Sequence, residues 1–405
     1  MKVKINKGTA RGTVSAPPSK SMAHRLLICA GLSKGTSIIR GISKSEDVKA
    51  TMACLSAIGA KCSLDGDTVT VTGSDISSIS PAQPLECNES GSTLRFFVPV
   101  CLASGNTAVL TGKGRLMSRP MSVYENICKE RNLTFIQDDK GLILKGPLTS
   151  GDFRVPGNIS SQFISGLLFA LPVLKGDSTI KILPPIESRP YIDMTLSALR
   201  TFGIEAGWKD ESTLTVKGNQ SYVPCDTSVE GDYSNAAFFS ALNVLGGDVT
   251  IDNLPEDSLQ GDKVFDKMKK QLCIGTPTLD ISACPDLGPI LFALASCKNG
   301  GIFSGTARLK IKESDRGQSM ADELKKFGVS VSIAEDEIII YPAEFHAPFE
   351  ELSGHNDHRI VMSMAVLLTQ TGGVIDGAEA VAKSYPSFFD DLSRLEIEVD
   401  KIETR

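Results

Sequence analysis

Hydrophobic and polar positions follow two recurring patterns along the chain. In the first, a helix-length segment that is apolar nearly all round ends at a Gly and precedes a short strand. Such helices are typical of burial on every side, and the Gly fits the left-handed residue that commonly ends a helix. The copies span residues 24–31, 94–105, 163–176, 236–247, 290–301 and 360–373.

The second pattern is an amphipathic helix, a short break that often contains Gly, and two short strands. Clear copies span residues 48–71, 123–144, 192–216 and 320–340, while 264–281 is a shorter copy and 388–402 a truncated one. A spacing of roughly 55 to 75 residues suits a βαβαββ unit. Ser45 and Ser188 stand before two of these helices, where we expect them to act as N-terminal caps.

Six buried and six surface helices predict six units of an α/β fold, three before about residue 220 and three after about residue 230. The last unit ends after a single strand at 397–402, and residues 3–5 form a spare strand. We therefore predict two hinged domains of three repeats each. The upper domain is residues 17–229, and the lower domain is residues 1–16 plus 230–405, completed by the N-terminal strand.

Composition and charge narrow the class of protein. The chain of 405 residues is 41% hydrophobic and 22% charged, as expected for globular domains. A net charge of −6 argues against a nucleic-acid partner, and the longest apolar runs are too short to span a bilayer. The ten cysteines form no metal-ligand spacing, so we expect buried thiols in a reducing, cytoplasmic compartment, without a metal site.

Polar residues of a particular kind precede each buried helix. Small hydroxyl residues stand beside Lys, Arg or Gln in the first half of the chain, and acids and amides stand there in the second. A helix N-terminus suits phosphate and carboxylate, because it offers unpaired N–H groups and a positive dipole end. We predict that these ends gather on one face of each domain and clamp an anionic substrate pair. The segments are 19–25, 89–95, 158–162, 231–235, 284–288 and 355–359.

Structural explanations compete with these functional ones. A single Ser- or Asp-led helix start is usually a cap. The charge-rich segment 310–316 would by default be a solvated loop, although a carboxylate beside two cations is also how a general acid or base is held near anions. Among four histidines, His358 is the candidate catalyst, with a helix-capping role as its alternative.

These motifs, in this order, resemble the 5-enolpyruvylshikimate-3-phosphate synthase family of enolpyruvyl transferases over essentially the whole chain. The resemblance implies an inside-out α/β prism of six βαβαββ repeats in two hinged domains. It also implies an active site in the interdomain cleft, a monomer, and no metal or organic cofactor. The motifs that carry it are residues 18–21 with Arg25, Gly91 with Arg95, 160–162, 188–191, 312–316, 356–359 and Lys383.

The activity that the resemblance implies is transfer of the enolpyruvyl group of phosphoenolpyruvate to the 5-hydroxyl of shikimate 3-phosphate, with release of phosphate, in the shikimate pathway of aromatic amino acid biosynthesis. Asp286 would take the hydroxyl proton, and Glu313 or Lys20 would protonate the methylene carbon. By similarity, shikimate 3-phosphate would be held by Lys20, Ser21, Arg25, Ser160, Ser161, Gln162, Ser188, Tyr191, Asp286 and Lys312. Phosphoenolpyruvate would be held by Lys20, Gly91, Arg119, Gln162, Arg316, Arg359 and Lys383.

Two residues depart from the family pattern. Glu89 stands where many members carry Asn, and Arg308 stands where an Asn that contacts the shikimate phosphate is common. Two other functions stay open. The sister transferase acting on UDP-N-acetylglucosamine typically carries a reactive Cys in the loop before an Arg-Pro, and residues 112–120 contain none. A non-catalytic anion-binding repeat protein would need no acid and base such as Asp286, Glu313 and Lys20.

Overall fold

The chain divides into two compact units in the computed structural model, which describes residues 1–76 and 79–402. The central unit is Pro18–Glu230, and the terminal unit is Met1–Pro17 together with Gly231–Arg405. The chain therefore passes from one unit to the other at Pro17/Pro18 and again at Glu230/Gly231. The last three residues of the predicted lower domain lie outside the described residues.

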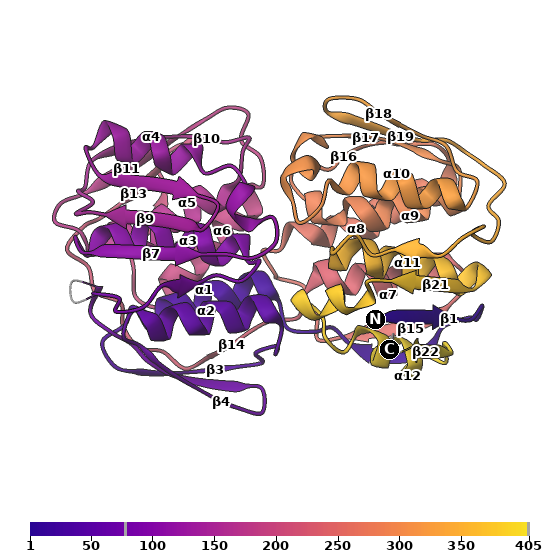
Figure 1. Cartoon of the computed structure of the whole chain (residues 1–405), viewed down its shortest axis with the longest axis horizontal. Helices are drawn as coiled ribbons and strands as arrows, with labels where there is room; N and C mark the ends of the chain where they lie inside the picture. The colour runs from indigo at the N-terminus through magenta and orange to yellow at the C-terminus, as the bar shows by residue number, and fades with distance from the viewer. Residues whose placement is uncertain (77–78, 403–405) are drawn as a thin grey trace. The chain divides into compact units, whose positions relative to one another are not determined.

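The described residues of the central unit form three four-stranded sheets, ordered β14-β3-β5-β4, β6-β7-β9-β8 and β10-β11-β13-β12. Figure 1 labels strands of each of these sheets. Its strands are β3 (Thr36–Arg40), β4 (Lys61–Asp65), β5 (Thr68–Thr72), β6 (Leu85–Glu86), β7 (Thr107–Thr111), β8 (Thr134–Asp138), β9 (Gly141–Lys145), β10 (Asp152–Pro156), β11 (Ser178–Leu183), β12 (Ala206–Trp208), β13 (Thr213–Val216) and β14 (Thr227–Ser228). Its helices are α1 (Lys20–Gly31), α2 (Glu46–Ala57), α3 (Gly91–Ala103), α4 (Ser122–Glu130), α5 (Ser161–Ala170) and α6 (Arg189–Thr201), with short 3-10 turns η2 (Leu116–Ser118) and η3 (Leu171–Val173).

The terminal unit holds sheets β20-β21-β1-β22, β16-β17-β19-β18 and the two-stranded β15-β2. Its strands are β1 (Lys2–Ile5), β2 (Arg11–Ser15), β15 (Asp248–Asp252), β16 (Thr278–Asp280), β17 (Gly301–Ser304), β18 (Val331–Ile333), β19 (Glu337–Ile340), β20 (Leu352–Ser353), β21 (Gly373–Asp376) and β22 (Val399–Ile402). Its helices are α7 (Tyr233–Val244), α8 (Phe265–Ile274), α9 (Gly288–Cys297), α10 (Arg316–Lys326), α11 (His358–Thr371) and α12 (Phe388–Arg394), with 3-10 turns η4 (Gly261–Val264), η5 (Pro285–Leu287), η6 (Ala307–Ile311) and η7 (Ala378–Lys383).

Strand pairing in the complete repeats follows one scheme. In the sheet of β10 to β13, β10 and β11 are parallel across the crossover helix α5, and β11 and β13 are antiparallel. Ile180 is opposite Phe153 on one side and Leu214 on the other, and all three side chains are buried. A parallel pair followed by an antiparallel hairpin is what βαβαββ means. The predicted α/β class with repeated βα units is therefore confirmed.

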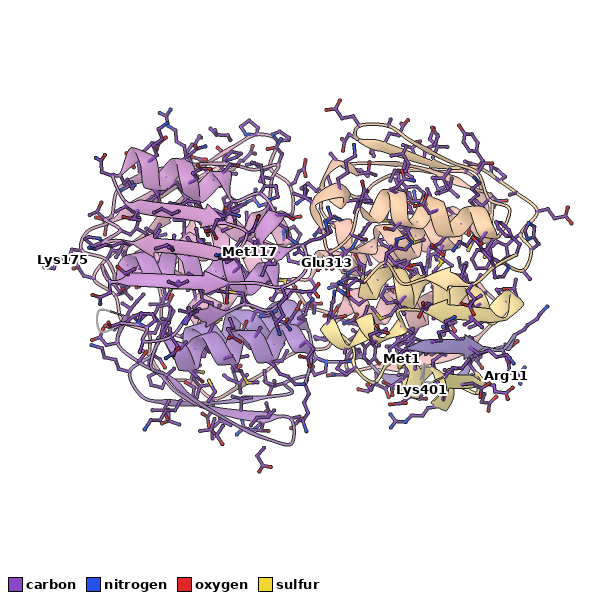
Figure 2. The ribbon with its side chains drawn as sticks, viewed as in Figure 1. Met1, Arg11, Met117, Lys175, Glu313 and Lys401 are labelled. Atoms are coloured by element: carbon purple, nitrogen blue, oxygen red, sulfur yellow. The ribbon has the colours of Figure 1, made fainter. Side chains whose placement is uncertain are left out.

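The N-terminal strand lies in the sheet of the last repeat. In β1, Val3 is opposite Ile375 of β21 and Lys401 of β22, and its side chain is fully buried. Figure 2 labels Met1, which immediately precedes β1, and Lys401 of the neighbouring strand β22. The fourth repeat differs from the prediction, because α8 is followed by β16 alone, and β16 belongs to the next sheet. Instead, β15 pairs with β2, a strand that the hydrophobic pattern did not reveal.

The six apolar helices form the cores of the two units. Helices α1, α3 and α5 are buried along most of their length in the central unit, as are α7, α9 and α11 in the terminal unit. Their prediction as buried helices is confirmed. No helix among the described residues is long and apolar enough to cross a bilayer. All ten cysteines are free thiols; six are buried, whereas Cys273 is exposed.

Two local predictions are wrong. Gly31 is a helical residue of α1 and not a left-handed cap. Its small size is required because an added Cβ would lie 2.3 Å from Cδ2 of Leu55. The serines at 45 and 188 do precede α2 and α6, but neither side chain accepts a capping hydrogen bond. At Ser188 the backbone itself is left-handed, with φ of 55°, so its hydroxyl does not take the usual cap geometry.

Candidate functional site

Serine side chains cap the three buried helices of the central unit. Ser19 accepts a hydrogen bond from the backbone N–H of Met22, and Ser90 accepts one from Thr93. Ser160 likewise caps α5 through the N–H of Gln162. The capping oxygens satisfy one N–H of each helix start, and the other early N–H groups keep the positive end of the helix dipole. The predicted anion-binding segments therefore do begin helices.

Arg25 is held by the start of α1 and by one face of α6. Its Nε donates to Oγ1 of Thr195 over 2.8 Å, its Nη1 to the carbonyl of Ser21 over 2.6 Å, and its Nη2 to the carbonyl of Tyr191 over 2.9 Å. Three of the predicted residues, Ser21, Arg25 and Tyr191, are thus brought together. Thr195 was not predicted, although it lies four residues after Tyr191 on the same helical face.

Lys20 at the start of α1 forms an ion pair with Asp47 of α2. Its Nζ lies 2.7 Å from Oδ2 of Asp47, with both side chains largely buried. Asp47 is a second residue that the sequence analysis did not single out as functional. An isolated buried ammonium would be disfavoured, and the ion pair with Asp47 offsets the cost of burying Lys20 at the start of α1.

A second cluster forms around Gly91. A Cβ at this position would lie 2.7 Å from Nη1 of Arg119, 3.6 Å from Nη1 of Arg95 and 3.7 Å from Oε1 of Gln162. Nη1 of Arg95 donates to Oε1 of Gln162 over 2.7 Å, and Nε2 of Gln162 donates to Oγ of Ser92 over 2.8 Å. An added Cβ at position 91 would therefore clash with the Arg119 guanidinium, whereas Arg95 and Gln162 would lie at ordinary contact distance.

Two arginines of the central unit carry charge without a carboxylate partner among the described residues. Arg25 is 3% exposed and Arg119 is 8% exposed, and neither takes part in an ion pair there. Burial lowers the pKa of Arg25 to about 10. Buried charges in proteins are normally paired. Each of these two guanidinium groups is therefore suited to bind an anion.

The backbone is left-handed just before several of these helix starts. Ser188 has φ of 55°, Asn88 has 50°, and His355 and Asn356 have 48° and 51°. Such conformations are unfavourable for residues other than glycine and cluster at functional sites. Left-handed residues therefore occur within two of the predicted segments, 188–191 and 355–359, and immediately before a third, 89–95.

The terminal unit gathers acids and cations around Arg316. Nη1 of Arg316 lies 2.9 Å from Oδ1 of Asp286, and Nη2 lies 2.7 Å from Oε2 of Glu313. Its Nε donates to Oδ2 of Asp357 over 2.9 Å. Glu313 is labelled in Figure 2 and lies three residues before α10. Because Arg316 is only 1% exposed, segment 310–316 is not the solvated loop that composition alone would suggest.

Asp286 accepts from three cations. Besides Arg316, Nζ of Lys312 lies 3.1 Å from Oδ1, and Nη2 of Arg359 lies 3.2 Å from Oδ2. Arg359 also donates to Oγ of Ser234 at the start of α7 over 2.7 Å. Glu313 and Asp357 also pair with Arg316, so the cluster contains three carboxylates and three cations. The cluster is balanced in formal charge, unlike the arginines of the central unit.

Burial and charge act against each other on these groups. Burial by itself would lower the pKa of Arg316, but Asp357, Glu313 and Asp286 raise it well above its usual value. Burial would raise the pKa of Asp357, but Arg316 brings it below its usual value. Burial lowers the pKa of Lys312, against the opposing effect of Asp286. The Arg316–Asp357 pair is therefore a fixed charged centre, on which Asp286 and Glu313 are oriented.

The remaining predicted residues take varied positions. Nζ of Lys383 donates to the carbonyl of Asn356 over 2.6 Å. The ring of His358 is 1% exposed, within 3.9 Å of the Asp357 carboxylate. Arg308 donates to the carbonyl of Ser282. Glu89 lies against the loop that leads to Arg119, since a Cβ at Gly114 would be 2.9 Å from its carboxyl carbon.

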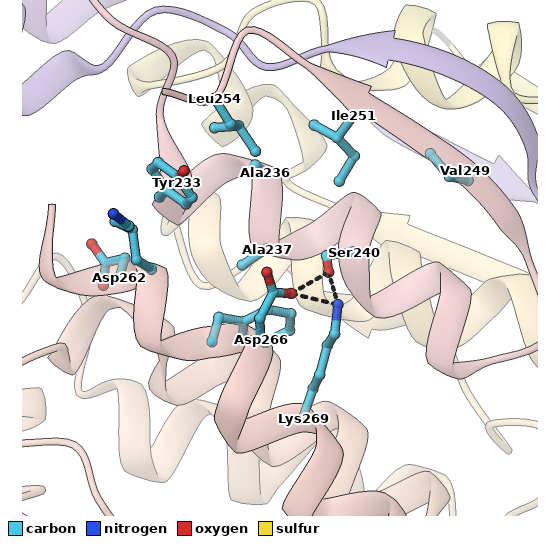
Figure 3. A pocket seen from close by; sticks show the side chains of 12 residues that line it. Tyr233, Ala236, Ala237, Ser240, Val249, Ile251, Leu254, Asp262, Asp266 and Lys269 are labelled. Atoms are coloured by element: carbon cyan, nitrogen blue, oxygen red, sulfur yellow. Dashed lines mark hydrogen bonds and ion pairs between the residues drawn. The ribbon is translucent and has the colours of Figure 1, made fainter. Parts of the chain in front are cut away.

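One pocket of the terminal unit lies outside the predicted set. It has a volume of about 230 Å³ and is lined by residues of α7, β15, α8 and the segments between them. Figure 3 shows Lys269 and Asp266 of α8 pointing toward Ser240 of α7, which they contact. Within the described part of the chain, no group of three or more His, Cys, Asp or Glu side chains is arranged to hold a metal ion.

Comparisons with known proteins agree with the arrangement of motifs. Residues 5–392 match the family model of EPSP synthase (3-phosphoshikimate 1-carboxyvinyltransferase). A 3-phosphoshikimate 1-carboxyvinyltransferase of Clostridium kluyveri is 39% identical, with 98% of each chain covered. One of Clostridium perfringens is 40% identical, with 97% of this chain and 98% of the relative covered.

A solved structure is similar over nearly the full length. The EPSP synthase of Acinetobacter baumannii superposes with a TM-score of 0.79 at 25% identity, covering 99% of this chain and all of that one. The likeness of fold therefore extends well beyond the motifs, to both units.

Proposed function

The chain belongs to the EPSP synthase family, and from this premise we propose that it transfers the enolpyruvyl group of phosphoenolpyruvate to the 5-hydroxyl of shikimate 3-phosphate and releases phosphate. This reaction serves the shikimate pathway. Both substrates are small anions, and both would be bound by the helix starts and cations described above. The UDP-N-acetylglucosamine transferase alternative is not favoured, because the family match and the relatives concern the shikimate enzyme.

The observation that carries the proposal is the pair of buried arginines, Arg25 and Arg119, that have no carboxylate partner among the described residues. An anionic ligand would offset their charge through charge-assisted, bidentate hydrogen bonds. We assign Arg25 to shikimate 3-phosphate with its neighbours Ser21, Tyr191 and Ser188. We assign Arg119 to phosphoenolpyruvate, with Gly91 and Gln162. Ser160 and Ser161 at the start of α5 complete the shikimate 3-phosphate set.

The acid–base chemistry is assigned to the terminal unit and to Lys20. Protonation of the methylene carbon of phosphoenolpyruvate leaves a cationic carbon, to which the 5-hydroxyl adds to give a tetrahedral ketal phosphate. Asp286 accepts the hydroxyl proton, because its carboxylate is oriented by Lys312, Arg316 and Arg359. Glu313 or Lys20 delivers the proton to carbon. In the second step the group that donated the first proton takes a proton back from the methyl carbon, the carbon–carbon double bond forms again, and the bond to phosphate breaks, so that inorganic phosphate leaves.

Arg316, Arg359 and Lys383 stay assigned to phosphoenolpyruvate as a prediction. Arg316 also has a clear internal role, since its guanidinium contacts three carboxylates among the described residues and holds them in place. His358 stays a candidate for proton transfer as a prediction, beside its alternative role at the start of α11. Reaction without a metal or organic cofactor, in the cytoplasm and as a monomer, remains part of this proposal.

The decisive assay measures phosphate release from purified protein supplied with phosphoenolpyruvate and shikimate 3-phosphate. Release that depends on both substrates supports the proposal. No release, or release with UDP-N-acetylglucosamine in place of shikimate 3-phosphate, contradicts it. Closure of the predicted domains on their substrates is a separate prediction. Small-angle scattering tests it, since an unchanged radius of gyration on addition of shikimate 3-phosphate would argue against closure.

A further inference from the structure

Four buried polar side chains form one continuous chain across α1, α2 and α3. Nδ1 of His24 lies 2.7 Å from Oγ1 of Thr51, which lies 2.7 Å from Oγ1 of Thr93. Oγ1 of Thr93 donates to Oγ of Ser90 over 2.7 Å. His24 is 1% exposed and the other three are fully buried. Buried polar atoms are held by such bonds, so the chain fixes three helices at once.

The hydrogen atoms of the chain can run in one direction. Thr93 donates its single hydroxyl hydrogen to Ser90, so in the Thr51–Thr93 bond the donor must be Thr51. The hydroxyl hydrogen of Thr51 is then used, and Nδ1 of His24 must be the donor to Thr51. The ring therefore carries its proton on Nδ1, and every donor in the chain points toward Ser90.

The state of the imidazole fits this direction. Burial, and after it Lys20 and Arg25, lowers the pKa of His24 well below its usual value. The ring is therefore neutral near pH 7, with one N–H. Nε2 has no hydrogen-bond partner among the described residues, as expected for the nitrogen that carries a lone pair toward apolar surroundings.

The ends of the chain adjoin the candidate site. His24 lies one helical turn after Lys20 and next to Arg25, while Ser90 caps α3 immediately before Gly91. Thr51 lies one turn after Asp47 on α2, so the Lys20–Asp47 ion pair and the His24–Thr51 bond are two successive links between the same helices. Helix α2 itself contributes no predicted substrate contact.

We propose that the chain His24–Thr51–Thr93–Ser90 is a positioning relay. It fixes the start of α3 relative to the start of α1, and the dipoles of its hydrogen-bonded groups point toward the anion site at Gly91. The four residues are positioning residues and touch no substrate. The relay acts on the backbone at Gly91, and through it on the group bound there. This inference rests on the proposed function for its kinetic consequences, but its hydrogen-bond pattern does not.

Thr51→Val tests the relay with little change of shape, since it replaces one hydroxyl by a methyl group. We expect KM for phosphoenolpyruvate to rise about tenfold, because small displacements at a site have effects of that order or larger. KM for shikimate 3-phosphate should change less than about twofold, because Arg25 is held by α6. Thr51→Ser restores the hydroxyl and should recover the wild-type KM.

The matched control is Thr369→Val on α11. It removes a buried hydroxyl too, but one that bonds only within its own helix among the described residues. It should lower stability without changing the KM ratio of the two substrates. Equal KM values in Thr51→Val and the wild type, or equal shifts for both substrates, would overturn the relay.

A second measurement is independent of activity. Two-bond proton–nitrogen NMR spectra of histidine-labelled protein at pH 7 distinguish the two neutral tautomers, and the signals lost in His24→Asn identify His24. We expect the Nδ1–H tautomer in the wild type and a shifted Nδ1 resonance in Thr51→Val. An Nε2–H tautomer, or an imidazolium, would refute the relay even in an active enzyme. An inactive wild type would refute the proposed function alone, and the NMR comparison would still decide the relay.

Discussion

Gly91 and Arg119 approach each other so closely that a Cβ at position 91 would lie 2.7 Å from Nη1 of Arg119. In Gly91→Ala the guanidinium, as the end of a flexible side chain, must move. We expect KM for phosphoenolpyruvate to rise about tenfold, with less than about a twofold change for shikimate 3-phosphate. Steady-state kinetics with each substrate varied in turn measures both.

Gly207→Ala is the control for this change. A Cβ at Gly207 has nothing within 4 Å, so both KM values should stay at their wild-type level. A Gly91→Ala enzyme that binds both substrates normally would show that Arg119 does not serve phosphoenolpyruvate through this contact.

Asp357 and Arg316 form a buried ion pair in the terminal unit, with side chains 0% and 1% exposed. In Asp357→Asn the arginine keeps its burial and loses a charged partner, so we expect the free energy of unfolding to fall by about 3 kcal/mol at pH 7. Urea denaturation measures the change. Asp390→Asn, which removes an exposed pair with Lys401, should change the unfolding free energy much less.

The acid dependence of the same variant follows from the direction of the shift. The pKa of Asp357 is lower in the folded chain than its usual value of about 3.9. Its stabilisation is therefore complete above that value and is lost as pH falls through the folded pKa. The difference in stability between the wild type and Asp357→Asn should shrink below about pH 4. A difference that stays constant to lower pH would contradict this account.

Stability should also depend on pH through His24, a group that is charged when protonated, unlike Asp357. Its pKa is lowered well below its usual value of about 6.5, so below that pH the unfolded chain binds a proton that the folded chain does not. Stability therefore falls as pH drops below about 6.5, by up to about 1.4 kcal/mol per pH unit from this group. His24→Asn should lose that slope, whereas His346→Asn, at an exposed position, should keep it.

The parts of the site that sequence predicts are those that a local pattern encodes. A serine before an apolar helix places Ser19, Ser90 and Ser160 at helix starts, because capping involves neighbours within three residues. Asp47 and Thr195 were not predicted as functional. Each acts on a residue from another helix, Lys20 and Arg25 respectively, and no spacing along a single chain encodes that partner.

The strands likewise divide into those that a local sequence pattern predicts and those that depend on a distant partner. Strand β1 could be predicted from its alternation and from the missing strand of the last repeat. Strand β2 has a single buried side chain, Val14, in its Arg-Gly-Thr-Val-Ser sequence, so it gives almost no hydrophobic period. Its order comes from pairing with β15, where Val14 is opposite Ile251 far along the chain.

Glu313 provides a direct test of the proton traffic. Glu313→Gln keeps an oxygen that can accept from Nη2 of Arg316 but cannot exchange a proton at the same position. If Glu313 is the acid, kcat should fall about 10²- to 10⁴-fold, with the thermal unfolding midpoint nearly unchanged. A kcat within about threefold of the wild type would assign the proton transfer to another group.

Lys20 combines a structural role with the proposed chemical one, and a double variant separates them. Lys20→Met should lower kcat by about 10²-fold or more and should also destabilise the unit, because Asp47 is left largely buried without the ammonium 2.7 Å away. Adding Asp47→Asn removes the unpaired charge, so stability should recover in urea denaturation while kcat stays low. Lys49→Met, which breaks the exposed pair with Glu46 on the same helix as Asp47, is the matched control and should leave kcat unchanged. If the double variant regained turnover along with stability, Lys20 would act only as the partner of Asp47, and the proton to the methylene carbon would have to come from Glu313.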